Sequence, residues 1–395
     1  MNQKKILILV EDVGRSAPGI VFERLISEMS SRHYVDVVCL KFDPSKPLHQ
    51  VKAISVLTDD SAALKYFIKP TVKNRISKYA LKFFSDDFGA RLISVLMWKV
   101  LESKHESLSQ YNCVLSMVSF RHVSPLILAE KIKKIKPSIR NIAYFVDAIP
   151  APLGWSSDDG EFRGTKKFIS KRINALDAIF SSNEKMLNYQ IALGKKNAPD
   201  CRGVVYNPTS VERQILPPPA RDKLNFLYTG GIYGKRTAKH VFHALKIVLK
   251  KYPTVFIVFV GSIFSECDFA MLTDSERRHV ETYPHTTDLT RFYSDATALL
   301  DIDADLDDDV FLSSKVINYL TLNRVIISET GKDSPATNLF SGLKSVLQCS
   351  HNPDEIAECM FHAIRIADTV DFCDRNNLIK ILSVHAAIDA IETAF

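Results

Sequence analysis

A lysine and an asparagine stand three residues apart at the start of a short helix-like segment, "SSKVINYL", which comprises residues 313–320. Ser313 or Ser314 can cap this helix, and Lys315 then lies in its first turn, where a cation opposes the helix dipole unless an anion is bound. Asn318 follows on the same helical face, and its amide can pair with sugar hydroxyls. A solvated helix start is the alternative interpretation. The pattern favours a place where a phosphate and a sugar are held.

A second loop combines glycines with two cations at the end of a predicted strand. In "LYTGGIYGKRTAKHVFHAL", Gly230 and Gly231 end the strand, and Lys235 and Arg236 precede a helix. Glycines let a backbone approach a phosphate closely, and the two cations neutralise it. The spacing matches neither the GxGxxG fingerprint nor a Walker loop. A tight turn with solvated cations is the alternative.

A third loop, "SETGKDSPATNLF", follows another predicted strand. Gly331 and the helix start at Ser334 and Pro335 offer free backbone N–H groups, although an ordinary strand-to-helix loop would look the same. Parallel sheets bind ligands beyond the carboxyl ends of their strands, so the three loops are expected to converge on one crevice. The ligand that fits such a crevice is a nucleotide diphosphate.

The elements that must position these loops alternate between strand and helix, and they do so twice. The predicted strands are residues 5–10, 35–40, 53–57, 112–118, 140–146, 178–182, 224–231, 254–262, 279–283, 296–303, 324–329 and 345–349. The predicted helices are residues 19–32, 124–135, 237–252, 288–295, 313–322 and 353–367. This alternation predicts an α/β protein of two Rossmann-like, doubly wound domains that face each other across a cleft.

A proline-rich segment separates the two halves. Residues 206–223 contain three consecutive prolines, which cannot continue a helix or a central strand, so they are expected to be a linker. The expected domains are therefore 1–205 and 224–375. Residues 376–395 are predicted to form an amphipathic helix that packs back toward the first domain.

The composition is that of an ordinary globular protein, with 46% apolar and 24% charged residues. No run of 18 apolar residues predicts a transmembrane helix, and the apolar start of the chain fits a buried strand better than a signal peptide. The seven cysteines include no CxxC pair, which indicates reduced thiols without zinc or disulfides and a cytoplasmic location.

The net charge of +6 is unevenly spread along the chain. Residues 61–85 contain six lysines and arginines, with aromatic and aliphatic residues between them and no acidic residue in the basic run from Lys65 to Lys82. Such a stretch can lie on an anionic membrane surface, and a solvated helix face over a core stripe is the alternative. No nucleic-acid-binding module is recognisable, so a nucleic-acid partner is not expected.

Two acidic patterns have spacings that are similar to those of metal sites. Aspartates at positions 301, 303, 305 and 307 alternate as in a calcium loop, but the glycine and glutamate that such a loop requires are missing. Asp303-Ala-Asp305 also has the spacing of a metal-binding DxD motif. We expect these acids to be solvated loop residues and expect no metal site.

Taken together, these segments resemble the retaining glycosyltransferases of family 4 (group 1), which have the two-domain GT-B architecture. The resemblance covers essentially the whole chain. "NFLYTGGIYGKRTAKHVFHAL" is similar to the phosphate loop of that family, and "DVFLSSKVINYLTLNRVIISETG" resembles its more specific SK segment. "EDVGRSAPGIVFERLISEM" resembles the glycine-rich acceptor-side loop.

The resemblance implies roles for individual residues. Arg236 and Lys315 match the cations that grip the donor pyrophosphate, with Lys235 as a neighbouring possibility. Asn318 stands where the family usually has a carboxylate that binds ribose, and Asp309 lies one position from the other acid of that pair. The remaining residues expected in the nucleotide-sugar site are Gly230, Gly231, Ser314 and Gly331.

The first half of the chain is expected to supply the acceptor side. Gly14, Arg15 and Gly19 belong to the loop that resembles the acceptor-side loop. Asp147, after the strand "NIAYFV", is the candidate catalytic residue near the sugar, although a loop-capping aspartate would look the same.

The expected function is retaining transfer of a sugar from a nucleotide-sugar donor to a lipid-linked acceptor in O-antigen, capsule or exopolysaccharide synthesis. The resemblance implies no metal or other cofactor. The protein would work in the cytoplasm, on the inner membrane surface through residues 61–85. A catalytically impaired scaffold subunit and a nucleotide-sugar 2-epimerase are the alternatives.

Overall fold

The computed structural model describes residues 3–42, 48, 51, 53–56, 90–102, 107–120, 122–155, 159–194, 198–209, 212–219, 221–306 and 309–395. The chain forms two compact units. Unit 1 consists of Met1–Pro208 together with Val384–Phe395, and unit 2 consists of Thr209–Ser383. The basic stretch at 61–85 lies outside the described residues.

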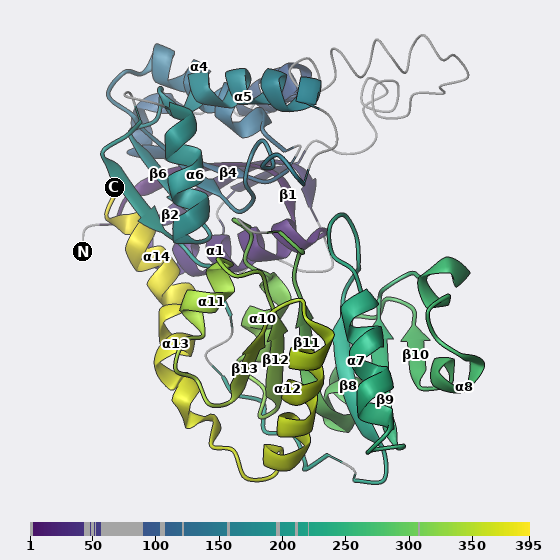
Figure 1. The fold of residues 1–395 in the computed structure, drawn as a ribbon. Helices are drawn as coiled ribbons and strands as arrows, with labels where there is room; N and C mark the ends of the chain where they lie inside the picture. Colours follow the sequence, from purple (N-terminus) through teal and green to yellow (C-terminus); the bar gives the residue numbers. More distant parts are fainter. Residues whose placement is uncertain are drawn as a thin grey trace. The chain divides into compact units, whose positions relative to one another are not determined.

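Unit 1 is built on a sheet of parallel strands in the order β3-β2-β1-β4-β5-β6-β7 (Figure 1). Its strands are β1 (Lys5–Val13), β2 (Tyr34–Phe42), β3 (Ala53–Val56), β4 (Cys113–Val118), β5 (Arg140–Phe145), β6 (Ala178–Ser181) and β7 (Cys201–Val204). Its helices are α1 (Ala17–Arg32), a helix over 90–102, α4 (Ser124–Ile135), α5 (Asp159–Ile173), α6 (Glu184–Gly194) and α14 (Val384–Glu392).

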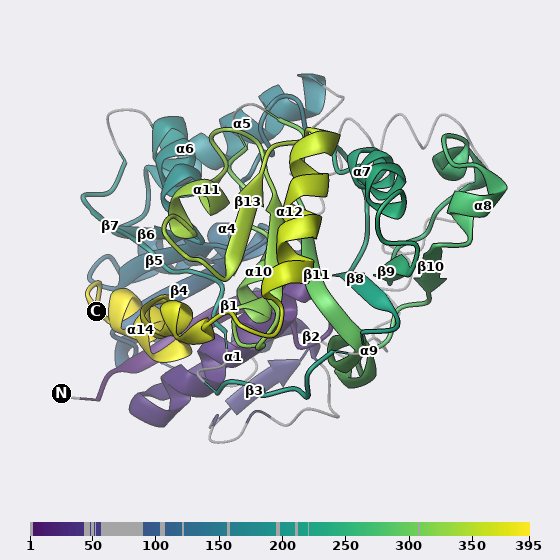
Figure 2. The same cartoon turned by 60° about the horizontal axis from the view of Figure 1, so that its bottom comes forward.

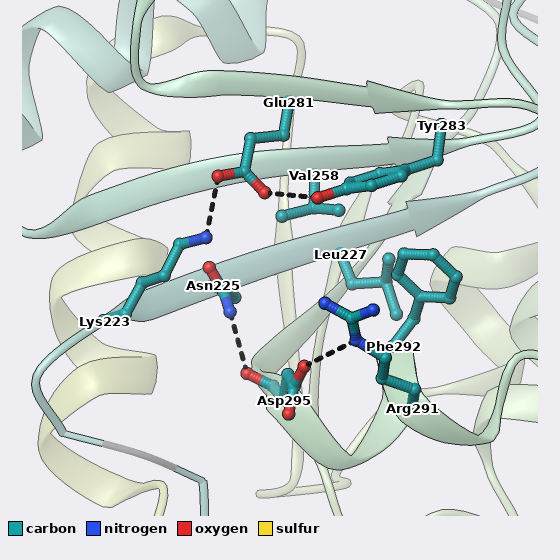
Figure 3. Close-up of a pocket in the computed structure, with 9 residues that line it drawn as sticks. All are labelled: Lys223, Asn225, Leu227, Val258, Glu281, Tyr283, Arg291, Phe292 and Asp295. Carbon is teal, nitrogen blue, oxygen red and sulfur yellow. Dashed lines mark hydrogen bonds and ion pairs between the residues drawn. The ribbon is translucent and has the colours of Figure 1, made fainter.

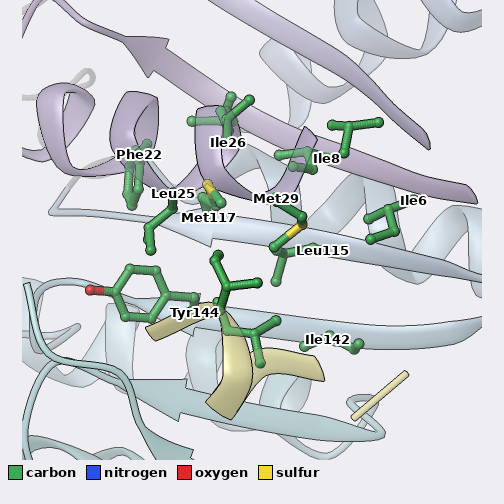
Figure 4. Packing of buried hydrophobic residues seen from close by; sticks show 14 of the residues in the cluster. Ile6, Ile8, Phe22, Leu25, Ile26, Met29, Leu115, Met117, Ile142 and Tyr144 are labelled. Carbon is green, nitrogen blue, oxygen red and sulfur yellow. The ribbon is translucent and has the colours of Figure 1, made fainter. Parts of the chain in front are cut away.

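The core of unit 1 forms because its strands are near-continuous apolar runs, as expected for a parallel sheet that is covered on both faces. Alternate residues of β1, such as Ile6 and Ile8, are fully buried against α1. Figure 4 shows Phe22 and Met29 of α1 on this face of the sheet, with Phe22 in edge-to-face contact with Tyr144 at 6.2 Å.

Unit 2 repeats the same plan, with parallel strands in the order β10-β9-β8-β11-β12-β13. Its strands are β8 (Leu224–Thr229), β9 (Val255–Val260), β10 (Val280–Tyr283), β11 (Ala296–Ile302), β12 (Val325–Glu329) and β13 (Val346–Cys349). Its helices are α7 (Lys239–Leu249), α8 (Asp274–Arg277), α9 (Thr290–Asp295), α10 (Ser314–Tyr319), α11 (Pro335–Leu339), α12 (Pro353–Ile366) and α13 (Asn376–Ile381). The helix α12 packs over β11, β12 and β13 and beside α7 on one apolar core, and Figure 2 shows α12 next to β13 and β11.

The strand order reverses at the first strand of each sheet. In unit 2 this places β9 on one side of β8 and β11 on the other, so the connections after β8 and β11 leave in opposite directions. A crevice forms at such a switch point, and ligands of doubly wound sheets bind there. The loops after β8 and β11 are therefore the ones that the fold makes available to a ligand.

The segment predicted as a linker, 206–223, is held by unit 2 over much of its length. The Thr209 N–H donates to the Leu382 carbonyl at 2.9 Å, and the Gln214 N–H donates to Thr321 at 3.0 Å. The Leu216 N–H donates to the Asn323 side chain at 2.8 Å. The division between the units thus falls between Pro208 and Thr209, near the start of the predicted linker.

The prediction of one helix over 376–395 was wrong. The chain forms α13, interrupts the helix at Leu382 and Ser383, and continues as α14. Ser383 pairs with Thr209 in an isolated bridge of unit 2, and this pairing takes its backbone out of the helix. The helix α14 then belongs to unit 1, where Ile388 and Ile391 are fully buried.

Polar contacts fix α14 to the end of α1. Arg32 forms an ion pair with Asp389 at 2.5 Å, and His33 Nε2 lies 3.0 Å from Glu392.

None of the helices that the structure describes is long and apolar enough to cross a membrane.

Candidate active site

The loop after β8 turns sharply at the switch point of unit 2. Gly230 has φ +105°, a left-handed conformation that glycine adopts without strain. Its N–H donates to Val260 at 2.7 Å, and its carbonyl accepts a hydrogen bond from the Ser262 hydroxyl at 2.6 Å. A side chain here would also meet the Lys315 Cε at 3.2 Å. The loop is therefore fixed in a shape that brings its backbone close to Lys315.

Arg236 lies after this loop and contacts the segment that follows β11. Its backbone pairs with Ala304 in an isolated antiparallel bridge, and its guanidinium lies 3.7 Å from the Asp303 carboxylate. Burial lowers the pKa of Arg236, but Asp303 and its other polar neighbours outweigh this and raise the pKa overall. The guanidinium thus stays charged in a largely buried position.

Lys315 reaches the same place from α10. Its ammonium group donates a hydrogen bond to the Tyr228 hydroxyl at 2.9 Å and lies 4.6 Å from the centre of the tyrosine ring. Burial and then Arg236 lower the pKa of Lys315, whereas Asp301 and Asp303 raise it, and the combined effect is a pKa of about 8. Two cations are therefore close enough to repel each other.

Two buried carboxylates balance these cations. Asp301 and Asp303 are each 1% exposed at the end of β11. Burial and the neighbouring Asp303 raise the pKa of Asp301 to about 6. Asp303 also accepts hydrogen bonds from the Ala304 N–H at 2.9 Å and the Ser334 hydroxyl at 3.2 Å. The expectation that these two aspartates are solvated was wrong, because Arg236 and Lys315 arrive from distant segments and provide counter-charges inside the fold.

The start of α10 and the loop before it contain the possible cap Ser313 and three residues expected in the nucleotide-sugar site, Asp309, Ser314 and Asn318. Ser313 occupies the N-cap position but its side chain makes no capping hydrogen bond. Ser314 and Asn318 are exposed on α10. Asp309 is buried instead, and its carboxylate accepts the Phe311 N–H at 3.0 Å. Ser314 and Asn318 are thus accessible to a ligand, whereas Asp309 supports the loop before the helix.

Gly331 allows two loops to pack closely, whereas Lys235 has an exposed side chain. A Cβ on Gly331 would lie 2.4 Å from the Leu306 carbonyl oxygen, so this position requires glycine for close packing of two loops. Lys235 is exposed, and its carbonyl accepts the Asp305 N–H at 3.4 Å. Gly231 accepts a hydrogen bond from the Tyr228 hydroxyl at 3.1 Å.

Tyr228 is a residue of this site that the sequence analysis missed. It contacts Lys315 and Gly231 through one hydroxyl group, and it is fully buried. A tyrosine near the end of a buried strand, directly before Thr-Gly-Gly, was the available signal, because a buried phenol needs a polar partner.

In unit 1, the loop after β1 is organised by Asp12. Its carboxylate accepts the N–H groups of Arg15 and Ser16, each at 3.2 Å. Gly14 has φ +80°, and a Cβ on Gly19 would lie 2.1 Å from Asp12 Oδ1. The two glycines are thus explained by loop geometry, while the Arg15 side chain is exposed.

Asp147 follows β5 and is partly buried. Its carboxylate accepts the Phe120 N–H at 2.9 Å. Burial raises the pKa of Asp147, although this hydrogen bond and the nearby His122 oppose the rise. Asp147 therefore braces the loop after β4, and it belongs to unit 1, whereas Arg236 and Lys315 belong to unit 2.

A separate hollow lies on the sheet of unit 2 beside β8, β9 and β10 (Figure 3). Its charges are paired with each other, with Lys223 to Glu281 at 2.7 Å and Arg291 to Asp295 at 3.8 Å. Lys223 stands at the amino end of β8, the opposite end from Gly230. The hollow is therefore not part of the cation site.

No protein-family model matches the chain, and no curated protein resembles it significantly in sequence. Solved GT-B glycosyltransferase structures, however, are similar over nearly the whole chain. HepE from Anabaena, in complex with UDP and glucose, has a TM-score of 0.62 at 11% identity and covers 99% of both chains. The lipopolysaccharide outer core galactosyltransferase WaaB has a TM-score of 0.62 at 17% identity, over 99% of this chain and 98% of its own.

A third similar structure, TarM, has a TM-score of 0.66 at 10% identity and covers 100% of this chain and 99% of its own. At these low identities the likeness concerns the fold. The sequence-based prediction of two Rossmann-like, doubly wound domains is confirmed, and the chain has the GT-B fold.

Proposed function

We propose that this protein is a retaining glycosyltransferase that moves a sugar from a nucleotide-sugar donor to a lipid-linked surface glycan. The observation that carries the proposal is the meeting of Arg236 and Lys315 at the switch point of unit 2. Asp301 and Asp303 offset the two positive charges only in part, since the pKa of Lys315 remains lowered, and a bound anion with two or more charges would relieve the remaining repulsion. A nucleoside diphosphate is such an anion.

In the proposed reaction, Arg236 and Lys315 stabilise the negative charge that develops on the leaving diphosphate. Groups that are held in place before the reaction do this most effectively, because no reorganisation is needed in the transition state. Asp303 holds Arg236 and Tyr228 holds Lys315, as the distances of 3.7 and 2.9 Å indicate. The two cations supply this stabilisation themselves, so we expect transfer to require no metal ion.

In a retaining transfer of this kind, the leaving diphosphate helps to take the proton from the attacking hydroxyl, which approaches from the same face of the sugar. The exposed Asn318 would hydrogen-bond to hydroxyl groups of the donor. Asp147 of unit 1 is proposed to act near the sugar. An NMR determination of the anomeric configuration of the product, against that of the donor, tests retention directly.

The acceptor is proposed to be a growing glycan of O-antigen, capsule or exopolysaccharide on a lipid carrier. Two features support this: the basic and aromatic residues within 61–85, and the fold shared with WaaB, which is named as a lipopolysaccharide outer core galactosyltransferase. The protein would then work at the cytoplasmic face of the membrane. Co-sedimentation with vesicles of anionic or neutral lipid tests this part.

Donor binding can be tested without knowledge of the acceptor. A panel of nucleoside diphosphates should include one that raises the melting temperature in a concentration-dependent way, because a ligand that binds only the folded state stabilises it. Lys315→Ala should abolish this rise. Lys344→Ala removes an exposed lysine of the same unit and should leave it intact. Equal responses of the wild type and Lys315→Ala would refute the assigned site.

A catalytically impaired partner subunit is the second candidate, and Asn318 is the observation that favours it. An amide at this exposed position carries no charge where the family resemblance expects a carboxylate. Donor turnover should be compared between the wild type and Asn318→Glu. If neither protein turns over any of a series of nucleotide-sugar donors, and the wild type co-purifies with an active transferase, the scaffold function is the correct one.

A further inference from the structure

Three side chains of types that can bind a metal ion lie close together near Ala304. His240 lies at the start of α7, Glu329 ends β12, and His351 follows β13. One ligand atom from each lies within 4.8 Å of the other two. The two imidazole rings are 5.7 Å apart between centres. From this arrangement we propose that His240, Glu329 and His351 form a site for a first-row transition-metal ion, with zinc as the best match.

The hydrogen bonds of His351 orient it as a ligand. Its Nε2 lies 3.1 Å from the Ala304 carbonyl oxygen, and its Nδ1 lies 2.8 Å from Glu329 Oε1. A carbonyl oxygen only accepts hydrogen bonds, so Nε2 carries a proton. In the neutral ring, Nδ1 then presents a lone pair to a carboxylate. A proton lies between two atoms at this separation, and a zinc ion could take the place of that proton once the two atoms had moved apart to about 3.3 Å.

The contact between Nε2 and a backbone carbonyl is also the one that commonly orients a metal-bound histidine. It sets the tautomer and leaves the other nitrogen free for the ion. The Ala304 carbonyl would therefore hold the His351 ring in the orientation that directs Nδ1 toward the ion.

Glu329 supplies a second, independent observation. Its side chain is 2% exposed, and its Oε2 atom accepts no hydrogen bond from any residue that the structure describes. A buried carboxylate oxygen without a partner costs free energy, which a bound cation would recover. Asp305 Oδ2 lies 3.7 Å from His240 Nε2 on an exposed side chain and can serve as a fourth ligand.

The chemical types of the three side chains indicate which metal ions the site would prefer. Two imidazoles and carboxylate oxygens suit zinc and related ions, whereas calcium and magnesium prefer oxygen ligands alone. In a tetrahedral zinc site, ligand atoms lie about 3.3 Å apart. The ligand atoms of the three residues lie within 4.8 Å of one another, so His240 would have to move slightly closer to the other two to bind the ion. Its side chain is only partly buried.

The ion would have a structural role. Ala304 accepts the hydrogen bond from His351 and pairs with the backbone of Arg236. An ion bound to His351 would thus hold the loops that carry Arg236 and Asp303. The site is separate from the transfer reaction, for which we propose no metal, so its test uses the metal ion alone.

The full-length protein, stripped of metal with a chelator, should bind one Zn²⁺ ion with high affinity in calorimetric titration. At 100 times the dissociation constant, Zn²⁺ should raise the melting temperature by about 5 °C. Co²⁺ in the same site should give the intense visible absorption of a tetrahedral complex.

Glu329→Gln and His240→Gln should each weaken Zn²⁺ binding at least tenfold and remove the cobalt absorption. His240→Gln changes a partly exposed side chain, so it tests the site even if Glu329→Gln does not fold. His362→Gln removes an exposed histidine of α12 and should behave as the wild type. The proposal is wrong if the wild type binds no Zn²⁺, or if both site variants bind it as tightly as the wild type.

Discussion

The ammonium group of Lys315 lies 2.9 Å from the hydroxyl of Tyr228 and 4.6 Å from the centre of its ring. The lysine comes from α10 and the tyrosine from β8, which are far apart in the sequence but adjacent at the switch point of unit 2. This contact holds a cation whose charged form is disfavoured by burial, and then by Arg236. The buried charge of Lys315 therefore lowers the stability of the folded protein, and it remains available to bind an anionic ligand.

Replacement of Lys315 by methionine should stabilise the ligand-free protein by about 1–2 kcal/mol at pH 7. The folded-state pKa of about 8 lies below the unfolded value of 10.5, so the charged lysine costs free energy below pH 8. Methionine removes this cost but also removes the hydrogen bond to Tyr228, which reduces the gain. Denaturant unfolding at pH 7 and pH 10 should show a smaller difference at the higher pH. A less stable Lys315→Met protein at pH 7 would contradict this account.

Diphosphate affinity should fall as the pH rises above about 8. Lys315 is charged below that pH and must gain a proton to bind an anion above it, which lowers the affinity by up to about tenfold per pH unit. Calorimetric titration between pH 7 and 9.5 measures this decline. Lys315→Arg keeps its charge throughout the range and should give a nearly flat profile. Parallel declines in the two proteins would assign the effect to another group.

Gly331→Ala should be strongly destabilising, by roughly 2 kcal/mol or more, because the new Cβ would lie 2.4 Å from the Leu306 carbonyl oxygen. Gly164→Ala is the matched control. Beyond its own turn of helix, no atom of the residues that the structure describes lies within 4 Å of the Cβ that this substitution adds to α5, and alanine favours a helix over glycine by about 0.5–1 kcal/mol. Thermal unfolding of the two variants should therefore shift in opposite directions.

Ile388→Ala should cost roughly 2–5 kcal/mol, although Ile388 lies only seven positions before the last residue, Phe395. Ile388 is fully buried in the core of unit 1, beside residues of α1 and β1. Ile381 on α13 is 56% exposed, and Ile381→Ala should change stability by less than about 0.5 kcal/mol. Denaturant unfolding followed by circular dichroism compares them, and similar midpoints would mean that α14 does not contribute to the core.

Most strands of both sheets could be predicted from the sequence, because a parallel strand buried on both faces is a near-continuous apolar run. The strand β7 was missed because it has four residues, includes Gly203, and none of its four side chains is fully buried. The helix α5 was missed because its sequence, "DGEFRGTKKFISKRI", is mostly polar and has few apolar positions that mark a buried face.

The sequence by itself determined the repeated strand–helix alternation and the loops in which glycines, Arg236 and Lys315 occur. Both are local properties, since they depend on the apolar period and on residue types within a few positions. Only the tertiary structure decided that Asp301 and Asp303 are buried, that Tyr228 holds Lys315, and that α14 completes unit 1. Each of these depends on partners that are distant in the sequence, and the reversal of strand order at β8 and the return of the chain to unit 1 bring them together.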